Sequence, residues 1–122
     1  MDIRLDPLSD TPIFMQLHDW IVRAIVRGDL PAGENLDSVR TVAGALDINP
    51  ATVKKAYDLL RSEGIIETSH RFGSVVLAPG EPVPGAEERL SAELRVLVAR
   101  ARCQGIEGAT VLRMVKTELG CD

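Results

Sequence analysis

Aromatic side chains are scarce in this chain of 122 residues, of which they make up only 3%. Apolar residues nevertheless account for 45%, so a hydrophobic core has to be built mainly from Leu, Val, Ile and Ala. No apolar run approaches the ~20 residues that a membrane-spanning helix needs. The first ten residues lack the charged-then-apolar order of a signal peptide. We therefore expect a cytoplasmic protein, without a membrane segment, that forms one modest domain and a small appendage.

Residues suited to catalysis or metal binding are equally scarce. The chain has two histidines and no Ser/His/Asp order, no Gly-rich phosphate loop and no paired metal ligands. We therefore expect no enzyme, no cofactor and no metal site. Cys103 and Cys121 lie far apart and lack the spacing of metal ligands. They are expected to be free thiols, with a redox or metal sensor as the alternative.

Positive charge is not in excess either, since the formal net charge is −4. Residues 10–78 carry seven Lys or Arg against nine Asp or Glu, a net charge of −2. This balance argues against a polycation that coats nucleic acid without specificity. It is compatible with a site-specific binder that concentrates its basic groups on one face.

The chain begins with a predicted tail, residues 1–11, followed by a first helix. Its apolar stripe recurs at helical spacing and consists of Ile13, Leu17, Ile21 and Ile25. Pro12 suits the first turn, where its missing N–H costs nothing, and Asp10 or Thr11 could cap the helix. Gly28 follows the stripe in the position of a C-terminal glycine.

Two further helices are predicted, separated by a link of three residues, 47–49. Asp37 or Ser38 caps the second helix, and Asn49 caps the third, with Pro50 in its first position. The inward-facing positions of the third helix are Val53, Ala56, Tyr57 and Leu60. A three-residue link is typical of a helix-turn-helix.

After the third helix, the spacing of the apolar residues changes from that of a helix to that of extended strands. Residues 65–66 and 75–77 are predicted to form two short strands, joined by a polar tip over residues 68–74. Three helices followed by a hairpin predict a mainly α fold with a small β-hairpin wing, a winged helix-turn-helix. It occupies residues 10–78.

A Pro- and Gly-rich linker is predicted at residues 79–85, followed by two amphipathic helices within residues 86–122. Helices of this size cannot bury both apolar stripes by themselves. They therefore need either the main domain or a second copy of the chain.

The N-terminal part of the third helix is the predicted DNA-reading element. In a helix-turn-helix this end enters the major groove, and its unpaired N–H groups and positive dipole suit phosphates. Its outward positions are Asn49, Pro50, Ala51, Thr52, Lys54 and Lys55. We assign Lys54 to a base edge, guanine being favoured, and Lys55 to a backbone phosphate or the flank. Arg40 of the second helix can reach a phosphate or a base edge.

The wing supplies the second predicted contact with DNA. Its tip carries Ser69, His70, Arg71 and Ser74. A basic tip can enter the minor groove or lie on the phosphate backbone. Lysines on an exposed helix are commonly only solvated, which is the alternative for Lys54 and Lys55. The shared orientation of the basic and hydroxyl side chains toward the DNA side favours binding.

The motifs of residues 12–76 resemble those of the GntR-type bacterial transcription regulators. The first motif, Gly-x-Leu-x-x-Gly-x-x-Leu then Ser-x-Arg, consists of Gly28, Leu30, Gly33, Leu36, Ser38 and Arg40. The second consists of Asn49, Thr52, Val53, Ala56, Tyr57, Leu60, Glu63, Gly64 and Ile66. The two short C-terminal helices look like those of the YtrA-type subfamily.

This resemblance implies a homodimer, formed through residues 86–122, that binds a pseudo-palindromic double-stranded DNA operator, usually as a repressor. The genes governed in that subfamily often include ABC transporters. An unknown small-molecule effector is also allowed, although two helices are too small to enclose one. The predicted DNA-binding residues are Ser38, Arg40, Asn49, Pro50, Ala51, Thr52, Lys54, Lys55, His70, Arg71 and Gly73.

Three positions depart from the family pattern. Asp37 stands where Pro is common, and Lys54 stands where Arg is common, although Arg is the better bidentate reader of guanine. The usual wing Arg-Gly-x-Gly-Thr appears here as residues 70–74, without its first Gly. A winged-helix module that binds proteins rather than DNA is the alternative, favoured by the net negative charge.

Overall fold

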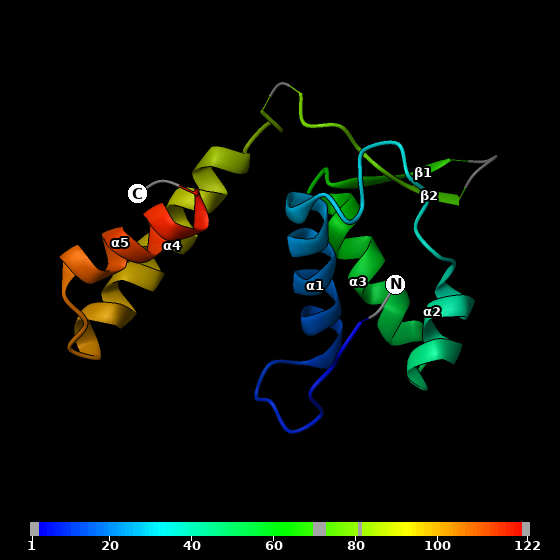
Figure 1. Cartoon of the computed structure of the whole chain (residues 1–122), viewed down its shortest axis with the longest axis horizontal. Coiled ribbons are helices and arrows are strands. Elements are labelled where there is room, and N and C mark those ends of the chain that lie inside the picture. Colours follow the sequence, from blue (N-terminus) through cyan, green and yellow to red (C-terminus); the bar gives the residue numbers. More distant parts are fainter. Residues whose placement is uncertain (1–2, 70–72, 81, 121–122) are drawn as a thin grey trace. The chain divides into compact units, whose positions relative to one another are not determined.

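The computed structural model describes residues 3–69, 73–80 and 82–120. They divide into two compact units, one ending at Glu81 and one beginning at Pro82 (Figure 1).

The first unit has the element order of a winged helix-turn-helix (Figure 1). Its elements are α1 (Ile13–Arg27), α2 (Val39–Leu46), α3 (Pro50–Ser62), β1 (Ile66–Ser69) and β2 (Gly73–Val76). The two strands pair antiparallel. With the two helices of the second unit, this confirms the predicted fold class.

At their N-terminal ends, α2 and α3 are capped by residues that the sequence predicted, whereas α1 is not. The side-chain oxygens of Ser38 and Asn49 accept backbone N–H groups at the start of α2 and α3. The prediction for α1 was wrong, because Pro12 itself is the cap and neither Asp10 nor Thr11 caps the helix. The Pro12 carbonyl accepts from the N–H groups of Met15 and Gln16, each at 3.0 Å, so the helix needs no side-chain cap to begin there.

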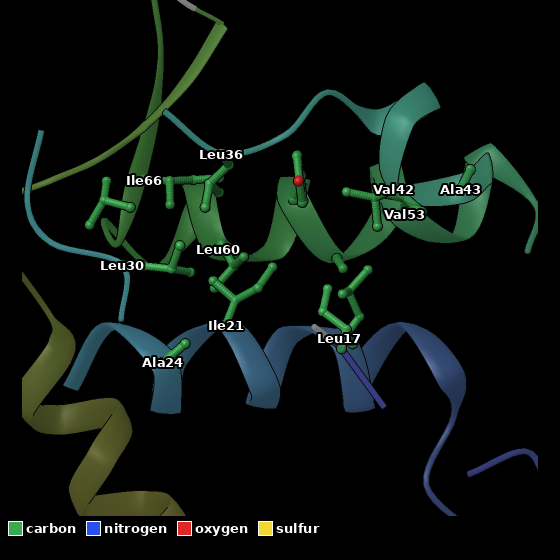
Figure 2. Packing of buried hydrophobic residues seen from close by; sticks show 14 residues of the cluster. Leu17, Ile21, Ala24, Leu30, Leu36, Val42, Ala43, Val53, Leu60 and Ile66 are labelled. Atoms are coloured by element: carbon green, nitrogen blue, oxygen red, sulfur yellow. The ribbon is translucent and has the colours of Figure 1, made fainter. Parts of the chain in front are cut away.

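The core of the first unit lies between α1 and α3 (Figure 2). Leu17, Ile21 and Ala24 of α1 are fully buried, as are Val53 and Leu60 of α3. Complete burial of each large aliphatic side chain contributes about 1.5–3 kcal/mol. This packing holds α3 along the length of α1 and leaves the opposite face of α3 open to solvent.

Tyr57 ties α3 to the segment that leads into α2. Its ring is buried, and its hydroxyl donates a 2.6 Å hydrogen bond to the backbone carbonyl of Asp37. Burial, with the nearby charge of Asp37, raises the pKa of Tyr57, so the hydroxyl remains a neutral donor. The start of α2 is therefore fixed against α3 by a bond that does not titrate at neutral pH.

The N-terminal segment is not the tail that the sequence predicted. Ile3 belongs to the buried core, and Leu5 packs against it. The side chain of Gln16 holds the following turn by accepting from the N–H of Asp6 at 2.7 Å and donating to the carbonyls of Asp6 and Thr11, both at 2.8 Å. A single apolar pair has no readable period, so sequence reasoning missed this anchoring.

The hairpin is also longer than predicted. Thr68 pairs with Ser74 and Ser69 with Gly73, so residues assigned to the polar tip continue the two strands. A ladder of backbone hydrogen bonds does not require apolar side chains, which explains the error. On the outer edge of β2, Asn35 bridges to Val75, so the loop between α1 and α2 lies along the hairpin.

The second unit consists of α4 (Ala86–Cys103) and α5 (Gly108–Glu118). The chain turns between them at Gly105, whose φ of +76° is readily adopted by glycine. Among the described residues of the two helices, only Ala101 is buried. Cys103 is a free, exposed thiol, whereas Cys121 lies outside the described residues. No helix in the described ranges is long and apolar enough to cross a membrane.

His18 links α1 to the end of α3, a contact that the sequence did not reveal. Its ring lies between two carboxylates, with Nδ1 2.8 Å from Asp19 and Nε2 2.5 Å from Glu63. Burial alone would lower the pKa of His18, but the hydrogen bonds and charges of Asp19 and Glu63 outweigh it and raise that pKa. The charged imidazole therefore stabilises the fold.

This contact makes stability depend on pH. Because the pKa of His18 is higher in the folded chain, its contribution is complete below the ordinary value of 6.5 and is lost as pH rises through the raised value. Urea unfolding of the wild type and of His18→Gln, at pH values from 6.5 upward, measures the difference. The stability gap between them is expected to narrow with rising pH, and a constant gap would contradict this role.

Candidate nucleic-acid interface

The N-terminal end of α3 is open to solvent, as a groove-reading helix requires. Asn49, Pro50 and Ala51 are exposed, and Thr52 is half-buried. The Asn49 side chain accepts from the N–H of Ala51 at 2.8 Å, and Pro50 has no N–H. The positive end of the helix dipole is thus presented at the surface, where it favours an anion such as phosphate.

The three-residue link holds α2 across this end of α3. Asp47 closes α2 in the left-handed conformation, with φ 54°, and the N–H of Ile48 donates to the carbonyl of Ala43 at 3.1 Å. Val42 and Ala43 are buried in the same core as Val53 of α3 (Figure 2). The two helices therefore form one packed pair, and the start of α2 follows a segment fixed by Tyr57.

Arg40 and Ser38 lie at the start of α2 but differ in their hydrogen bonds. Arg40 is exposed, and among the described residues it has no hydrogen-bond or ion-pair partner. Ser38 accepts from the N–H of Thr41 at 3.1 Å and donates to the Thr41 hydroxyl at 2.8 Å. Arg40 is therefore available to a ligand, whereas Ser38 already caps its own helix.

The two adjacent lysines of α3 point to different neighbours. Lys54 donates to the carboxylate of Asp58 at 2.6 Å, and Lys55 lies 4.1 Å from the centre of the Phe14 ring on α1. This divergence follows from the ~100° between successive residues of a helix. Of the two lysines, only Lys54 is paired with an acidic residue of α3 among the described residues.

Asp58 is the site residue that sequence reasoning missed. It accepts from Lys54 and also pairs with Arg61 at 3.3 Å. The hydrogen bond from Lys54, with the charges of both cations, lowers the pKa of Asp58, so it stays ionised. The i, i+4 spacing of Lys54 and Asp58 was the signal that could have revealed the pair.

The wing is described only up to its tip. Gly73 is exposed and has φ +74°, and a Cβ atom there would meet no atom within 4 Å. Glycine is therefore needed for the backbone conformation rather than for space. His70 and Arg71, both predicted to contact DNA, lie outside the described residues.

Comparison with known proteins matches this chain to bacterial transcription regulators. The model of a family described as bacterial regulatory proteins, gntR family, matches residues 15–76. The HTH-type transcriptional repressor YtrA of Bacillus subtilis (strain 168) is 35% identical over 107 residues, which cover 86% of this chain and 82% of that protein.

Solved structures agree with this match. YtrA from Sulfolobus acidocaldarius, a GntR-family transcription factor, is 35% identical with a TM-score of 0.68, covering 83% of this chain and 97% of that one. A transcriptional antiterminator from Listeria monocytogenes EGD-e has a TM-score of 0.84 at 23% identity, over 94% of this chain and 87% of that one. At that identity the likeness shows the fold alone.

The Lys54–Asp58 pair leads to a prediction about affinity. Asp58→Asn is expected to tighten DNA binding by up to about fivefold, since an exposed ion pair is worth about 0–1 kcal/mol and the change frees Lys54. Fluorescence anisotropy of a labelled duplex measures the effect. Asp29→Asn is the matched control, because it removes the same charge from an exposed pair, Asp29–Arg27, outside α2 and α3. Equal effects of both variants would contradict a specific role of Asp58.

Proposed function

Since this chain belongs to the GntR family of bacterial regulatory proteins, we propose that it represses transcription as a homodimer bound to a pseudo-palindromic operator. It is a DNA-binding transcription regulator with a winged helix-turn-helix, from a family of regulators rather than enzymes. The repressor role is supported by the name of its Bacillus subtilis relative. It acts in the cytoplasm, on an operon that includes a transporter.

The observations that carry this proposal are the exposed N-terminal end of α3 and, on α2, an exposed Arg40 that has no hydrogen-bond or ion-pair partner among the described residues. The start of α3 enters the major groove, where Lys54 leaves Asp58 to contact a guanine edge. Lys55 and Arg40 contact phosphates or the flanking base edges. The remaining contacts come from backbone and small side chains at Ser38, Asn49, Pro50, Ala51 and Thr52, and from the wing residues His70, Arg71 and Gly73.

The second unit supplies the dimer contact, in residues 86–122. Leu90, Leu94 and Leu97 of α4 are 66%, 49% and 43% exposed, and Leu112 and Val115 of α5 are also exposed. Between the helices lies an apolar groove of about 440 Å³. An apolar surface of this kind on a pair of helices is stabilised when a second copy covers it.

Two-fold symmetry sets the form of the operator. A dimer of helix-turn-helix units binds two half-sites whose centres are about 10 base pairs apart, or a multiple of that, on one face of the duplex. Linking two copies of the winged helix-turn-helix raises the overall affinity for the operator without any new base contact. This gain offsets the net negative charge of residues 10–78.

That negative charge also supports a second candidate, a winged-helix module that binds a protein partner instead of DNA. The two functions differ in their dependence on salt. A DNA complex releases counterions, so its affinity falls steeply as salt rises. Gel shift on the promoter region of the protein's own gene, repeated over a salt series, separates them, and a slope near zero would exclude DNA binding.

Substitution of the two proposed reading residues tests the placement of the site. Arg40→Ala and Lys54→Ala are each expected to weaken operator binding by ~1–3 kcal/mol, because each removes a contact to a base edge or phosphate. Arg89→Ala serves as the control, since it removes one exposed charge from α4, outside α2, α3, the hairpin and the leucines proposed to form the dimer. Affinity at the wild-type level in both test variants would refute the assignment.

Substitution of the exposed leucines tests the dimer. Leu94→Glu with Leu112→Glu is expected to give monomers in sedimentation and to weaken operator binding by roughly 10²-fold or more, through loss of avidity. Deleting residues 86–122 should have the same effect. Leu8→Glu is the control, because Leu8 is 92% exposed in the first unit. A deletion protein that still sediments as a dimer would contradict the proposal.

A further inference from the structure

A cavity of about 310 Å³ lies between the N-terminal segment and α1. The residues that matter most in its lining are Arg4, Asp6, Asp19, Trp20, Arg23 and Arg27. They occupy the first unit and are separate from the residues proposed to contact DNA. The volume is close to the lower end of the range for small-molecule sites, about 300–1,000 Å³.

The wall of this cavity is held in place before any ligand arrives. Ile3 is anchored in the core at one end of the segment. Further along, Gln16 makes three hydrogen bonds of 2.7–2.8 Å to the backbone of Asp6 and Thr11. A preformed wall lowers the entropy cost of binding, because the segment does not have to be ordered by the ligand.

The lining of the cavity carries one more positive than negative charge, although the chain as a whole is acidic. Three arginines line it against two carboxylates. Both carboxylates are already engaged, since Asp6 accepts from the N–H of Leu8 at 3.0 Å and Asp19 from His18 at 2.8 Å. Among the described residues, Arg4 and Arg23 have no ion-pair partner, and Arg27 uses its Nε for Asp29. Guanidinium donors are therefore free to bind an anion.

Trp20 gives the cavity a flat apolar side. It is the only tryptophan of the chain and is half-buried, packed in part against the core. The same side chain also lines a neighbouring cavity on the side of Leu30 and Asn35. An indole wall beside guanidinium groups suits a ligand that joins a planar ring to a negative group.

We propose that this cavity binds a small organic anion, with its carboxylate or phosphate on Arg4 and Arg23 and its planar ring against Trp20. Neither group alone is sufficient. The anion requires the two arginines, and the ring requires the indole face. The site is distinct from the DNA interface and from the groove of α4 and α5, so its failure leaves the proposed repressor function intact.

Fluorescence of Trp20 in the full chain tests the proposal directly, because no other tryptophan contributes to the signal. The probes are nicotinate and adenosine monophosphate, and the reference compounds are adenosine and inorganic phosphate. A saturable change is expected with at least one of the two probes, at concentrations well below those required for either reference compound. The absence of a saturable change with both probes, or an equal response to adenosine, would overturn the proposal.

Two variants identify the anion contact. Arg23→Gln and Arg4→Gln are each expected to weaken probe binding by roughly tenfold or more, since each removes a charge-assisted hydrogen bond. Arg113→Gln on α5 is the matched control and should bind as the wild type does. Thermal unfolding identifies any variant that fails to fold, and the other then carries the test. Folded variants that keep wild-type affinity would overturn the assignment.

Discussion

The packing of α1 against α3 is the contact on which the rest of the structure depends. Leu17, Ile21 and Ala24 are fully buried there, and they fix which side of α3 faces the core. The other side of α3, with Lys54, is left exposed as a consequence. Tyr57 extends this order to the segment before α2, and His18 extends it to the end of α3. The geometry of the winged helix-turn-helix thus follows from an aliphatic core, which the polar contacts of Tyr57 and His18 reinforce.

In the winged helix-turn-helix, the pairing of single charged side chains matters more for the proposed DNA contact than the net charge does. The net charge of residues 10–78 is −2, and Asp58 neutralises the lysine that is proposed to read a base. In the proposed complex, binding of DNA would exchange Asp58 for a base edge as the partner of Lys54. Such an exchange favours selectivity over raw affinity, because a poor base contact does not repay the loss of Asp58. The two-copy arrangement proposed for residues 86–122 would restore affinity through avidity.

Sequence reasoning succeeded where the determining signal is local. The caps Ser38 and Asn49, the three-residue link and the buried positions of α3 all depend on residues a few positions apart. It failed where the interacting residues are far apart in the sequence, or where too few apolar residues recur to show a period. Glu63 lies 45 positions from His18, and Ile3 has no repeating neighbours to mark it. The strand pairing of Thr68 with Ser74 also escaped notice, because polar side chains gave no alternation of apolar and polar residues.

The central claim is that two copies of this chain place the start of α3 in successive major grooves of one operator. Methylation-interference footprinting on the bound operator tests it most directly, because methylation at guanine N7 blocks a major-groove contact. Interference is expected at guanines in two symmetric half-sites, whose centres are separated by about 10 base pairs or a multiple of that. Lys54→Ala should remove the interference at one guanine of each half-site. Interference confined to one half-site, or none in the major groove, would contradict the claim.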